Sequence, residues 1–431
     1  MDLKKKYIKY VSQNILGMIG ISAYILADTF FISQAEGADG ITALNLVLPL
    51  YSLIFAIGSM IAVGSAIKFT ILRARNDKKS DLYFSNALMF CVIFGVLFML
   101  VGAVVPDKLI GLLGGDGRIV AVGTPYTRIF MLFAPFFMAN YVCNAFVRND
   151  GNPSLAMKAT LFSSLFNIVF DYILMFPMRL GMAGAALATA FSPIVGILIC
   201  CIHFFSKKNT VKFIWQRPSI GKLFESCQLG LSAFIGEMAS GVTTAVFNYL
   251  ILMLAGNDGV AAYGIVANTS IVATSMFNGV AQGSQPLFSE LYGKGDKEAV
   301  KKIWKMAAMT ALGLSLLVIL VTRVFTLQIV DLFNSENNVQ MAAYAIEGVR
   351  LYFPGFLFAG FNIVGAGYLS ATESAGWAFL TSIVRGVVAI SLCAVIMGSL
   401  FGMSGVWLAF SAAECLTAIL MVVAVRRGEN R

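Results

Sequence analysis

Two acidic residues stand in stretches of sequence that are otherwise apolar. Asp171 lies in the run NIVFDYILMF at 167–176, and Asp28 lies in YILADTFFI at 24–32. A charge at the centre of a membrane-spanning helix costs about 2.5 to 3.5 kcal/mol, so each carboxylate should readily take up a cation. If the two side chains approach each other, their repulsion strengthens this tendency. Such a pair can bind and release a small cation, which is the chemistry of an ion-coupling site.

Polar residues recur beside both acids at helical spacing. In the segment 158–178, a single helix face carries Thr160, Ser163, Ser164, Asn167 and Asp171, and Gly20 and Tyr24 precede Asp28 in the same way. The two acids with the Asn167 amide oxygen could hold H⁺, or they could act as oxygen ligands of Na⁺, and the sequence leaves both open. As an alternative, each acid is only a structural group paired with a buried cation or hydroxyl, for which Arg128 is the available arginine in the same half.

The elements that position these residues are membrane-spanning helices. Hydrophobic residues make up 58% of the 431 residues, charged residues make up 12%, and the mean hydropathy is +0.82. The chain is therefore expected to be an all-α integral membrane protein. Apolar runs of sufficient length predict twelve transmembrane helices at about 11–33, 41–68, 84–106, 123–147, 158–178, 182–205, 224–254, 260–287, 303–324, 342–368, 377–399 and 404–425. The first run is expected to be a spanning helix and not a removable signal peptide.

The net charge of +9 is explained by membrane topology. Of the 31 Lys and Arg residues, 24 fall in the N-terminal segment, the C-terminal segment and alternate connections between helices. This is the positive-inside pattern, which predicts a multi-pass protein of the inner (plasma) membrane with both termini in the cytoplasm. The lipid bilayer is therefore the expected partner, no nucleic acid is expected to bind, and the protein is expected to be monomeric.

The chain contains an internal repeat. A shift of 219 residues pairs Gly40 with Gly259 and Pro135 with Pro354, and a shift of 221 aligns GMAGAALA at 181 with GMSGVWLA at 402. Each copy holds six helices and begins on the same side of the membrane. We therefore expect two six-helix lobes related by a pseudo-two-fold axis along the membrane normal, with a cavity between them. The expected divisions are an N-lobe at 1–205, a cytoplasmic linker at 206–222 and a C-lobe at 223–431.

The second copy differs in its chemistry. The repeat places Phe247 opposite Asp28 and Leu392 opposite Asp171, so the acids are not repeated. The residues expected to line the cavity are Tyr24, Glu237, Thr244, Asn248, Asn268, Gln282 and Asn362, while Arg385 and Glu414 are expected to form a buried pair. An acidic cavity with Phe and Met side chains would favour amphipathic organic cations.

The segment 144–190 carries a resemblance to a known family. NAFVRNDGNPSLAMKATLFSSLFNIVFDYILMFPMRLGMAGAALATA combines N-x-x-x-R, a Gly-containing turn, N-x-x-x-D and G-x-x-G-A-A-x-A-T, and DTFF at 28–31 adds to the pattern. It resembles the multidrug and toxic compound extrusion (MATE) transporters. The resemblance implies an antiporter with a cation-coupling site of Asp28, Asp171, Asn167 and Asn144. It also makes Glu237 a candidate coupling acid and implies a bend in the first helix, for which this chain offers Gly17 and Gly20 instead of a proline.

The predicted function is secondary antiport that exports amphipathic, cationic organic compounds in exchange for H⁺ or Na⁺. No cofactor is expected, and the metal ligands would be Asp28, Asp171 and Asn167 only if Na⁺ is the coupling ion. No G-x-x-x-x-G-K-[ST] loop for ATP occurs. The alternatives are a flippase for a lipid-linked headgroup, held by Arg128, Arg350 and Arg385, and a membrane-embedded enzyme. An enzyme is not expected, because seven scattered cysteines and one histidine offer no nucleophile or metal motif.

Overall fold

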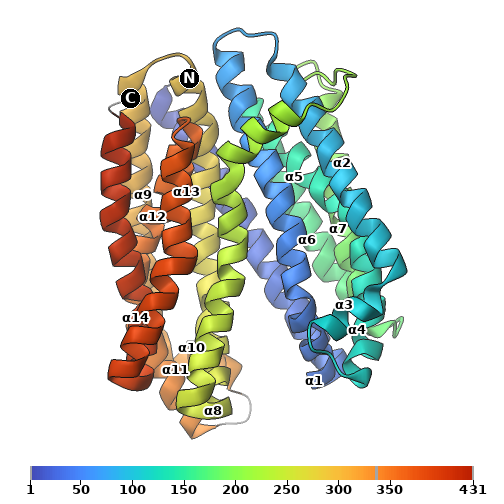
Figure 1. Cartoon of the computed structure of the whole chain (residues 1–431), viewed down its shortest axis with the longest axis vertical. Coiled ribbons are helices and arrows are strands. Elements are labelled where there is room, and N and C mark those ends of the chain that lie inside the picture. Colours follow the sequence, from blue (N-terminus) through green and yellow to red (C-terminus); the bar gives the residue numbers. More distant parts are fainter. Residues whose placement is uncertain (1, 335–337, 430–431) are drawn as a thin grey trace.

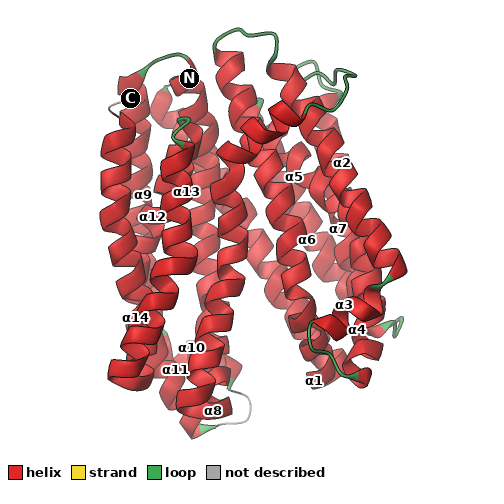
Figure 2. Ribbon diagram, in the orientation of Figure 1, coloured by secondary structure: helices red, strands yellow, loops and turns green. Residues whose placement is uncertain are grey.

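The protein is a pair of helical bundles that stand side by side. The computed structural model describes residues 2–334 and 338–429, and no strand occurs in that part of the chain (Figures 1 and 2). The N-lobe contains α1 (Leu3–Ala74), α2 (Ser80–Val104), α3 (Pro106–Leu112), α4 (Gly117–Leu132), α5 (Ala134–Asn149), α6 (Pro153–Met175) and α7 (Gly181–Phe204). The C-lobe contains α8 (Ile220–Gly293), α9 (Lys297–Val324), α10 (Thr326–Phe333), α11 (Val339–Tyr352), the 3₁₀ turn η1 (Phe353–Gly355), α12 (Phe356–Ala371), α13 (Ala375–Ile383), the π-helical turn η2 (Val384–Ala389) and α14 (Ile390–Glu429).

Three long helices are each broken at a glycine. Gly37 in α1, Gly256 in α8 and Gly402 in α14 have φ of 60°, 62° and 61°, a region that glycine enters without a steric penalty because it has no Cβ. By length and composition, nine stretches of the described chain could cross a membrane, and α4 with α5, bent by 48°, makes a tenth. Two of the nine, Ile220–Gly293 and Ala375–Gly428, contain a glycine break and form two spans each. The twelve predicted helices are therefore confirmed, and α3 and α10 are short additions that the sequence did not predict.

The breaks follow the internal repeat. Gly37 and Gly256 are 219 residues apart, as are Pro135 at the start of α5 and Pro354 in η1. Gly181 and Gly402, which are 221 residues apart, both have positive φ. The same interruptions thus occur at matching places in both lobes, as expected for two copies of one six-helix unit.

Each lobe has its own apolar core. Fully buried side chains of the N-lobe include Tyr126, Phe130 and Phe146, and those of the C-lobe include Phe277 and Trp407. The C-lobe core also takes in side chains from the first turns of α1: Tyr7, Tyr10 and Val11. The beginning of α1 therefore fastens the N-lobe to the C-lobe.

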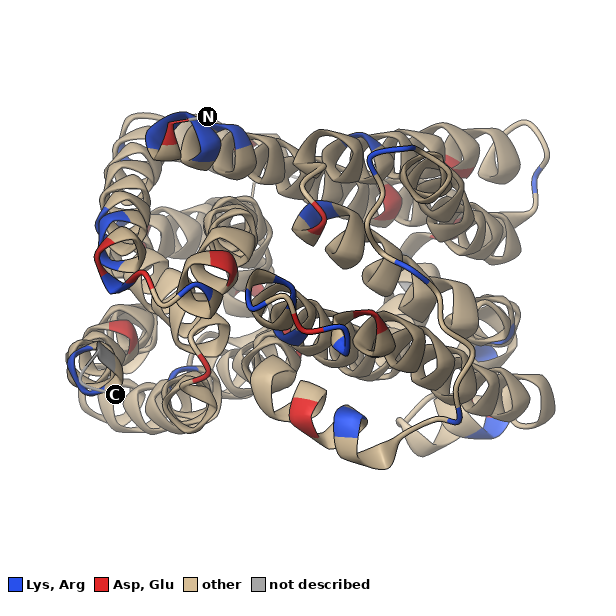
Figure 3. Cartoon of the chain, turned by 90° about the horizontal axis from the view of Figure 1, so that it is seen from above, with Lys and Arg blue, Asp and Glu red and all other residues tan. Residues whose placement is uncertain are grey.

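Closely packed glycines join the lobes at one end of the molecule. We call this end, which carries both termini and the segment between α7 and α8, the basic face. Figure 3 looks onto it and shows Lys and Arg on its helix ends and connections. A Cβ added to Gly64 would lie 1.8 Å from the carbonyl oxygen of Ser226, and one added to Gly230 would lie 1.9 Å from that of Met60. Only glycine permits backbones to approach this closely.

A second crossing mirrors the first one. Gly283, the repeat mate of Gly64, packs against the backbone of Tyr10 and Val11, at 2.9 and 2.8 Å from an added Cβ. Val11 is in turn the repeat mate of Gly230. The pseudo-two-fold relation therefore extends to individual contacts between the lobes.

The segment between the lobes is non-helical and lies along the start of α2. It covers residues 205–219, so the last residues of the predicted linker already belong to α8. The backbone N–H groups of Lys212, Ile214 and Ser219 donate to side chains at the start of α2, namely Asp81 (3.2 Å), Ser85 (2.7 Å) and Asn86 (2.8 Å). These bonds fix the linker to the N-lobe.

Candidate functional site

The two intramembrane acids lie together because α1 and α6 pack closely. Gly20 in α1 leaves room for Leu161 of α6, since an added Cβ would come within 2.6 Å of that side chain, and Gly17 faces Thr160. Farther along the same helix faces, the side chains of Asp28 and Asp171 lie within hydrogen-bonding reach of each other. Both are buried. Neither Gly17 nor Gly20 has non-helical backbone angles, so α1 continues as a helix through both, and they serve as packing positions.

Asn167 completes the contact between α6 and α7. In the amide orientation that satisfies both of its polar groups, Nδ2 donates to Asp171 Oδ2 (3.1 Å) and Oδ1 accepts from the Thr189 N–H (3.2 Å) and hydroxyl (3.1 Å). Gly184 allows this approach, because an added Cβ would lie 3.0 Å from the backbone of Leu174. Thr189 was not singled out in the sequence, although it belongs to the GAALATA stretch.

The acid pair has free oxygens and no positively charged partner in the described part of the chain. Oδ1 of Asp28 and Oδ1 of Asp171 are buried without a hydrogen-bond partner, and neither acid forms an ion pair within residues 2–334 and 338–429. Arg128, the arginine considered as a partner, is exposed. Two buried carboxylates in contact cannot both stay charged unless a cation neutralises them. The pair can therefore hold a proton, and its oxygen-only donor set also suits Na⁺.

A cluster of aromatic side chains lies near the pair. Tyr51 and Phe130 pack with ring centroids 3.6 Å apart, and Tyr126 packs 5.8 Å from Tyr51. Tyr51 and Tyr126 lie within electrostatic range of Asp28, and Tyr126 lies within hydrogen-bonding reach of Thr189. These residues were missed in the sequence because tyrosine in an apolar run resembles ordinary core. Tyr126 and Phe130 belong to α4, so this helix lies beside the site.

Asn144, also expected in this site, lies elsewhere. Its Nδ2 donates to the Thr160 hydroxyl (3.0 Å) and to the Ala156 carbonyl (3.2 Å) on α6. Thr160 precedes Asn167 by seven residues, about two helical turns. In this conformation Asn144 therefore binds the part of α6 nearer the basic face, and the structure does not place it against the acids.

Tyr24 connects the acid pair with the C-lobe. It lies within electrostatic range of Asp28, Asp171 and Glu237. Tyr141 lies within range of Glu237 and Tyr24, although it was not among the residues expected here. Tyr24 and Glu237 are both partly exposed. The interlobe region next to the acid pair is thus acidic and aromatic.

The other residues expected in the cavity fall into three places. Thr244, Asn248 and Asn268 are at least partly exposed on α8, on either side of Gly256. Gln282 accepts a hydrogen bond from Arg148 (2.9 Å) at the basic-face crossing instead. Asn362 has no exposed surface, so the prediction that it lines the cavity is wrong.

Asn362 belongs to a buried polar cluster within the C-lobe. Its Nδ2 donates to Glu414 Oε2 (2.7 Å), and Nε of Arg385 donates to Glu414 Oε1 (2.8 Å). The predicted Arg385–Glu414 pair is therefore confirmed. Arg385 projects from the π-helical turn η2, whose wider winding is a common feature of functional or strained sites.

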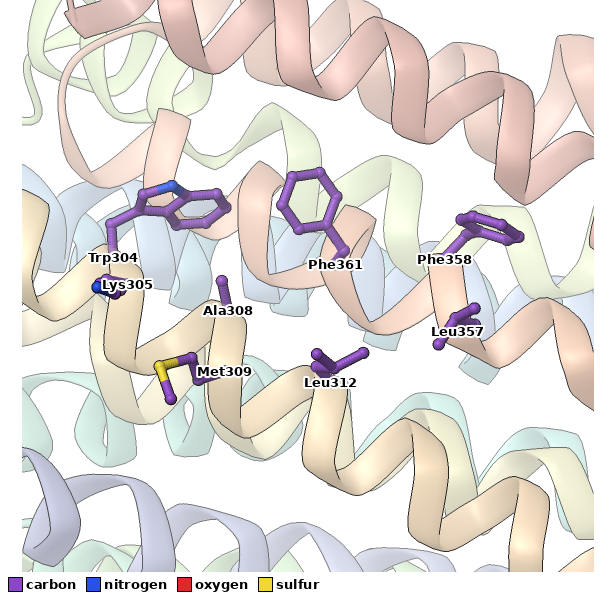
Figure 4. A pocket seen from close by; sticks show the side chains of 8 residues that line it. All are labelled: Trp304, Lys305, Ala308, Met309, Leu312, Leu357, Phe358 and Phe361. Carbon is purple, nitrogen blue, oxygen red and sulfur yellow. The ribbon is translucent and has the colours of Figure 1, made fainter.

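A groove on the C-lobe lies apart from this site. Figure 4 shows its lining side chains on α9 and α12. Its volume is about 520 Å³, and its lining is apolar except for Lys305. It contains no acid. It therefore offers nothing for cation coupling.

Comparison with known proteins identifies the type of molecule that has this arrangement. The family model MatE matches residues 14–173 and 233–395, which is more than half of the chain. The multidrug export protein MepA of Staphylococcus saprophyticus subsp. saprophyticus is 28% identical over 409 residues, covering 94% of this chain and 90% of MepA. MepA of Staphylococcus aureus is 28% identical over 408 residues, covering 93% of this chain and 89% of its own length.

Solved structures share the fold. A multidrug resistance MATE family transporter of the MOP superfamily in an outward-facing conformation superposes with a TM-score of 0.93 at 23% identity, covering 99% of this chain and 96% of that one. A MOP superfamily transporter from Pyrococcus furiosus, described as having a binding pocket of reverse polarity, gives a TM-score of 0.91 at 22% identity with the same coverage. The two-lobe arrangement is therefore one already seen in solved transporters.

Proposed function

The chain belongs to the MatE family of membrane transporters, and we propose that it exports amphipathic, cationic organic compounds in exchange for H⁺ or Na⁺ bound at Asp28 and Asp171. The observation that carries this proposal is the buried acid pair with two unpartnered oxygens. A transporter needs a site whose charge changes during the cycle, and a permanently paired acid could not provide one. The family consists of transporters and not enzymes, so no covalent step is involved.

The interlobe region supports a cationic, partly apolar substrate. Glu237 provides negative charge, and Tyr24 and Tyr141 provide aromatic faces that attract organic cations. The curated relatives are multidrug export proteins, which accords with a surface suited to more than one compound.

The conformation supports an assignment of the two sides. We place the basic face in the cytoplasm, because Lys and Arg favour that side. The interlobe hydrogen bonds and ion pairs that the structure describes lie near this face, and they include Lys68–Glu373 (2.7 Å) and Lys6–Glu290 (2.5 Å). Closed contacts there would leave the site accessible from outside, as in the outward-facing relative.

The proposed cycle uses the acid pair as a switch. In the outward-facing state a cation enters between Asp28 and Asp171, and its charge weakens the hold on a cationic substrate, which leaves. The neutralised site permits the lobes to rearrange. The cation then dissociates into the cytoplasm, which restores the negative charge that attracts the next substrate molecule.

The variant Asp28→Asn tests the proposal. A hydrogen bond to a charged group contributes about 1.5 to 3 kcal/mol, so losing the carboxylate should weaken coupling-ion binding by roughly 10- to 150-fold. Dye efflux should be measured in inverted vesicles under a proton gradient and, separately, a sodium gradient. The gradient that drives efflux in the wild type but not in the variant identifies the ion.

The matched control is Asp331→Asn, which neutralises an exposed acid of α10. Both variants should unfold at the wild-type temperature. Gradient-driven efflux by folded Asp28→Asn at the wild-type rate would contradict the proposal.

The flippase alternative receives less support from the arginines. Arg385 is engaged by Glu414, and Arg128 and Arg350 are exposed. A diphosphate headgroup would need several free cations directed into one cavity. The acids and tyrosines of the interlobe region favour the opposite charge.

A further inference from the structure

A polar cavity lies at the basic face, away from the acid pair. Its volume is about 530 Å³. The first turns of α1, the end of the second half of α1, the loop after α5 and the end of α8 form its walls. Both lobes therefore contribute to it.

Positive charge exceeds negative charge in the lining. The cations are Lys6, Lys9, Arg73 and Lys294, and the acids are Asp150 and Glu290. Arg73 also pairs with Asp81 (3.6 Å), which lies outside the lining, so one positive charge remains in excess. Both acids are already engaged. Glu290 contacts Lys6 (2.5 Å) and Lys294 (2.6 Å), whereas Asp150 accepts from His203 (2.8 Å) and the Thr210 N–H (2.8 Å).

Two donors in the cavity have no partner among the residues that the structure describes. The Lys9 ammonium forms no ion pair or hydrogen bond within the described ranges, and the Tyr10 hydroxyl donates to no described acceptor. Tyr10 is only 5% exposed, so its hydroxyl is held by the fold and not by chance at a surface. A Cβ added to Gly151 would lie 3.9 Å from that hydroxyl, at ordinary contact distance, so Gly151 borders it.

We propose that this cavity binds a phosphate-bearing anion, with Lys9 and the Tyr10 hydroxyl as its principal donors. A phosphate group accepts several hydrogen bonds, and its negative charge is opposite in sign to the excess charge of the lining. It can belong to an anionic phospholipid headgroup, because basic pockets beside cytoplasmic helix ends are typical lipid sites, or to a free phosphate compound. This site is separate from the proposed coupling site and does not depend on it.

The position of the cavity gives the anion a structural effect. Lys9 and Arg73 belong to the N-lobe, whereas Lys294 belongs to the C-lobe. An anion held by both lobes stabilises the arrangement in which they meet at the basic face. Its binding should therefore favour the conformation described here.

The test measures thermal unfolding of the purified full-length protein. One arm titrates sodium phosphate against sodium chloride at equal ionic strength and pH, in detergent. The other arm compares nanodiscs of phosphatidylcholine with nanodiscs that also contain phosphatidylglycerol. A rise in unfolding temperature with phosphate identifies a free anion as sufficient, and a rise with phosphatidylglycerol alone identifies a lipid headgroup; either result supports the site.

Variants distinguish the site from general screening. Lys9→Gln and Tyr10→Phe should each raise, about fivefold or more, the anion concentration that gives half of the rise in unfolding temperature. This is the effect expected for the loss of one donor to phosphate. Lys5→Gln removes the same charge from an exposed position outside the cavity and should leave the half-saturating anion concentration unchanged. Equal effects of chloride and phosphate, no rise in either arm, or equal behaviour of all three variants would overturn the proposal.

Discussion

At the scale of single residues, the surroundings of a carboxylate decide what it can do. Glu414 in the C-lobe is buried, but Arg385 and Asn362 satisfy it, so it has a structural role. Asp28 and Asp171 are also buried, but each keeps an oxygen without a partner. An acid whose oxygens are held by hydrogen bonds and an ion pair stabilises one structure, whereas a pair of acids with unpartnered oxygens is able to exchange a cation.

The contact between Thr189 and Asn167 can be tested by Thr189→Val. The change keeps the side-chain shape but removes the hydroxyl that orients the Asn167 amide toward Asp171. One such hydrogen bond contributes about 1 kcal/mol, so the coupling-ion concentration for half-maximal efflux should rise about fivefold. Ion-dependent efflux measures this value.

Thr124→Val serves as the control, because the Thr124 hydroxyl bonds only to the carbonyl of Val120 in its own helix among the described residues. An unchanged ion dependence in Thr189→Val would show that the Asn167 amide does not need this contact.

At the scale of elements, glycines perform two different tasks. Gly37, Gly256 and Gly402 reverse the sign of φ and end one span so that another can begin. Gly20, Gly64, Gly230 and Gly283 are helical and allow another helix to approach. The first task shapes each lobe, and the second decides which helices touch.

Gly230→Val tests the packing role. An added Cβ would lie 1.9 Å from the Met60 carbonyl oxygen, so the α1–α8 crossing must open. Overpacking of this kind costs about 1 to 3 kcal/mol, and the unfolding temperature should fall accordingly.

Gly236→Val is a matched control in the same helix, because nothing described lies within 4 Å of its added Cβ. Both changes alter helix propensity equally. If the two variants are equally stable, the close crossing at Gly230 contributes nothing to the fold.

At the scale of the whole molecule, the two lobes meet near the basic face through two crossings related by the repeat. The Ser65 and Ser226 hydroxyls lie 2.9 Å apart at the first one, and Tyr7 lies within reach of Ser284 at the equivalent position of the second. Transport by alternating access requires these contacts to separate and form again. The structure therefore represents one end of the proposed cycle.

A disulfide across the first crossing should stop the cycle. Ser65→Cys with Ser226→Cys places two thiols where the hydroxyls now touch, so mild oxidation should link them and block dye efflux. Reduction should restore efflux to the rate seen before oxidation. To detect the disulfide, a protease cuts the chain between the lobes, and gel mobility then shows whether the two fragments remain linked.

The single variant Ser65→Cys controls for the seven native cysteines. Full efflux by the cross-linked protein would show that the lobes do not separate at this crossing.

The sequence by itself determined the twelve helices, the repeat and the acids that lie within the membrane. These follow from local composition and spacing, because a bilayer requires long apolar helices and makes an isolated acid conspicuous. The tertiary structure decided which residues meet. It placed Asp28 beside Asp171, moved Asn144 and Gln282 to other contacts, buried Asn362, and added Thr189 and the tyrosines. Helical spacing predicts which residues lie on the same face of a helix. It does not predict which other helix packs against that face, because this depends on how closely two backbones can approach, and small residues on both helices set that distance.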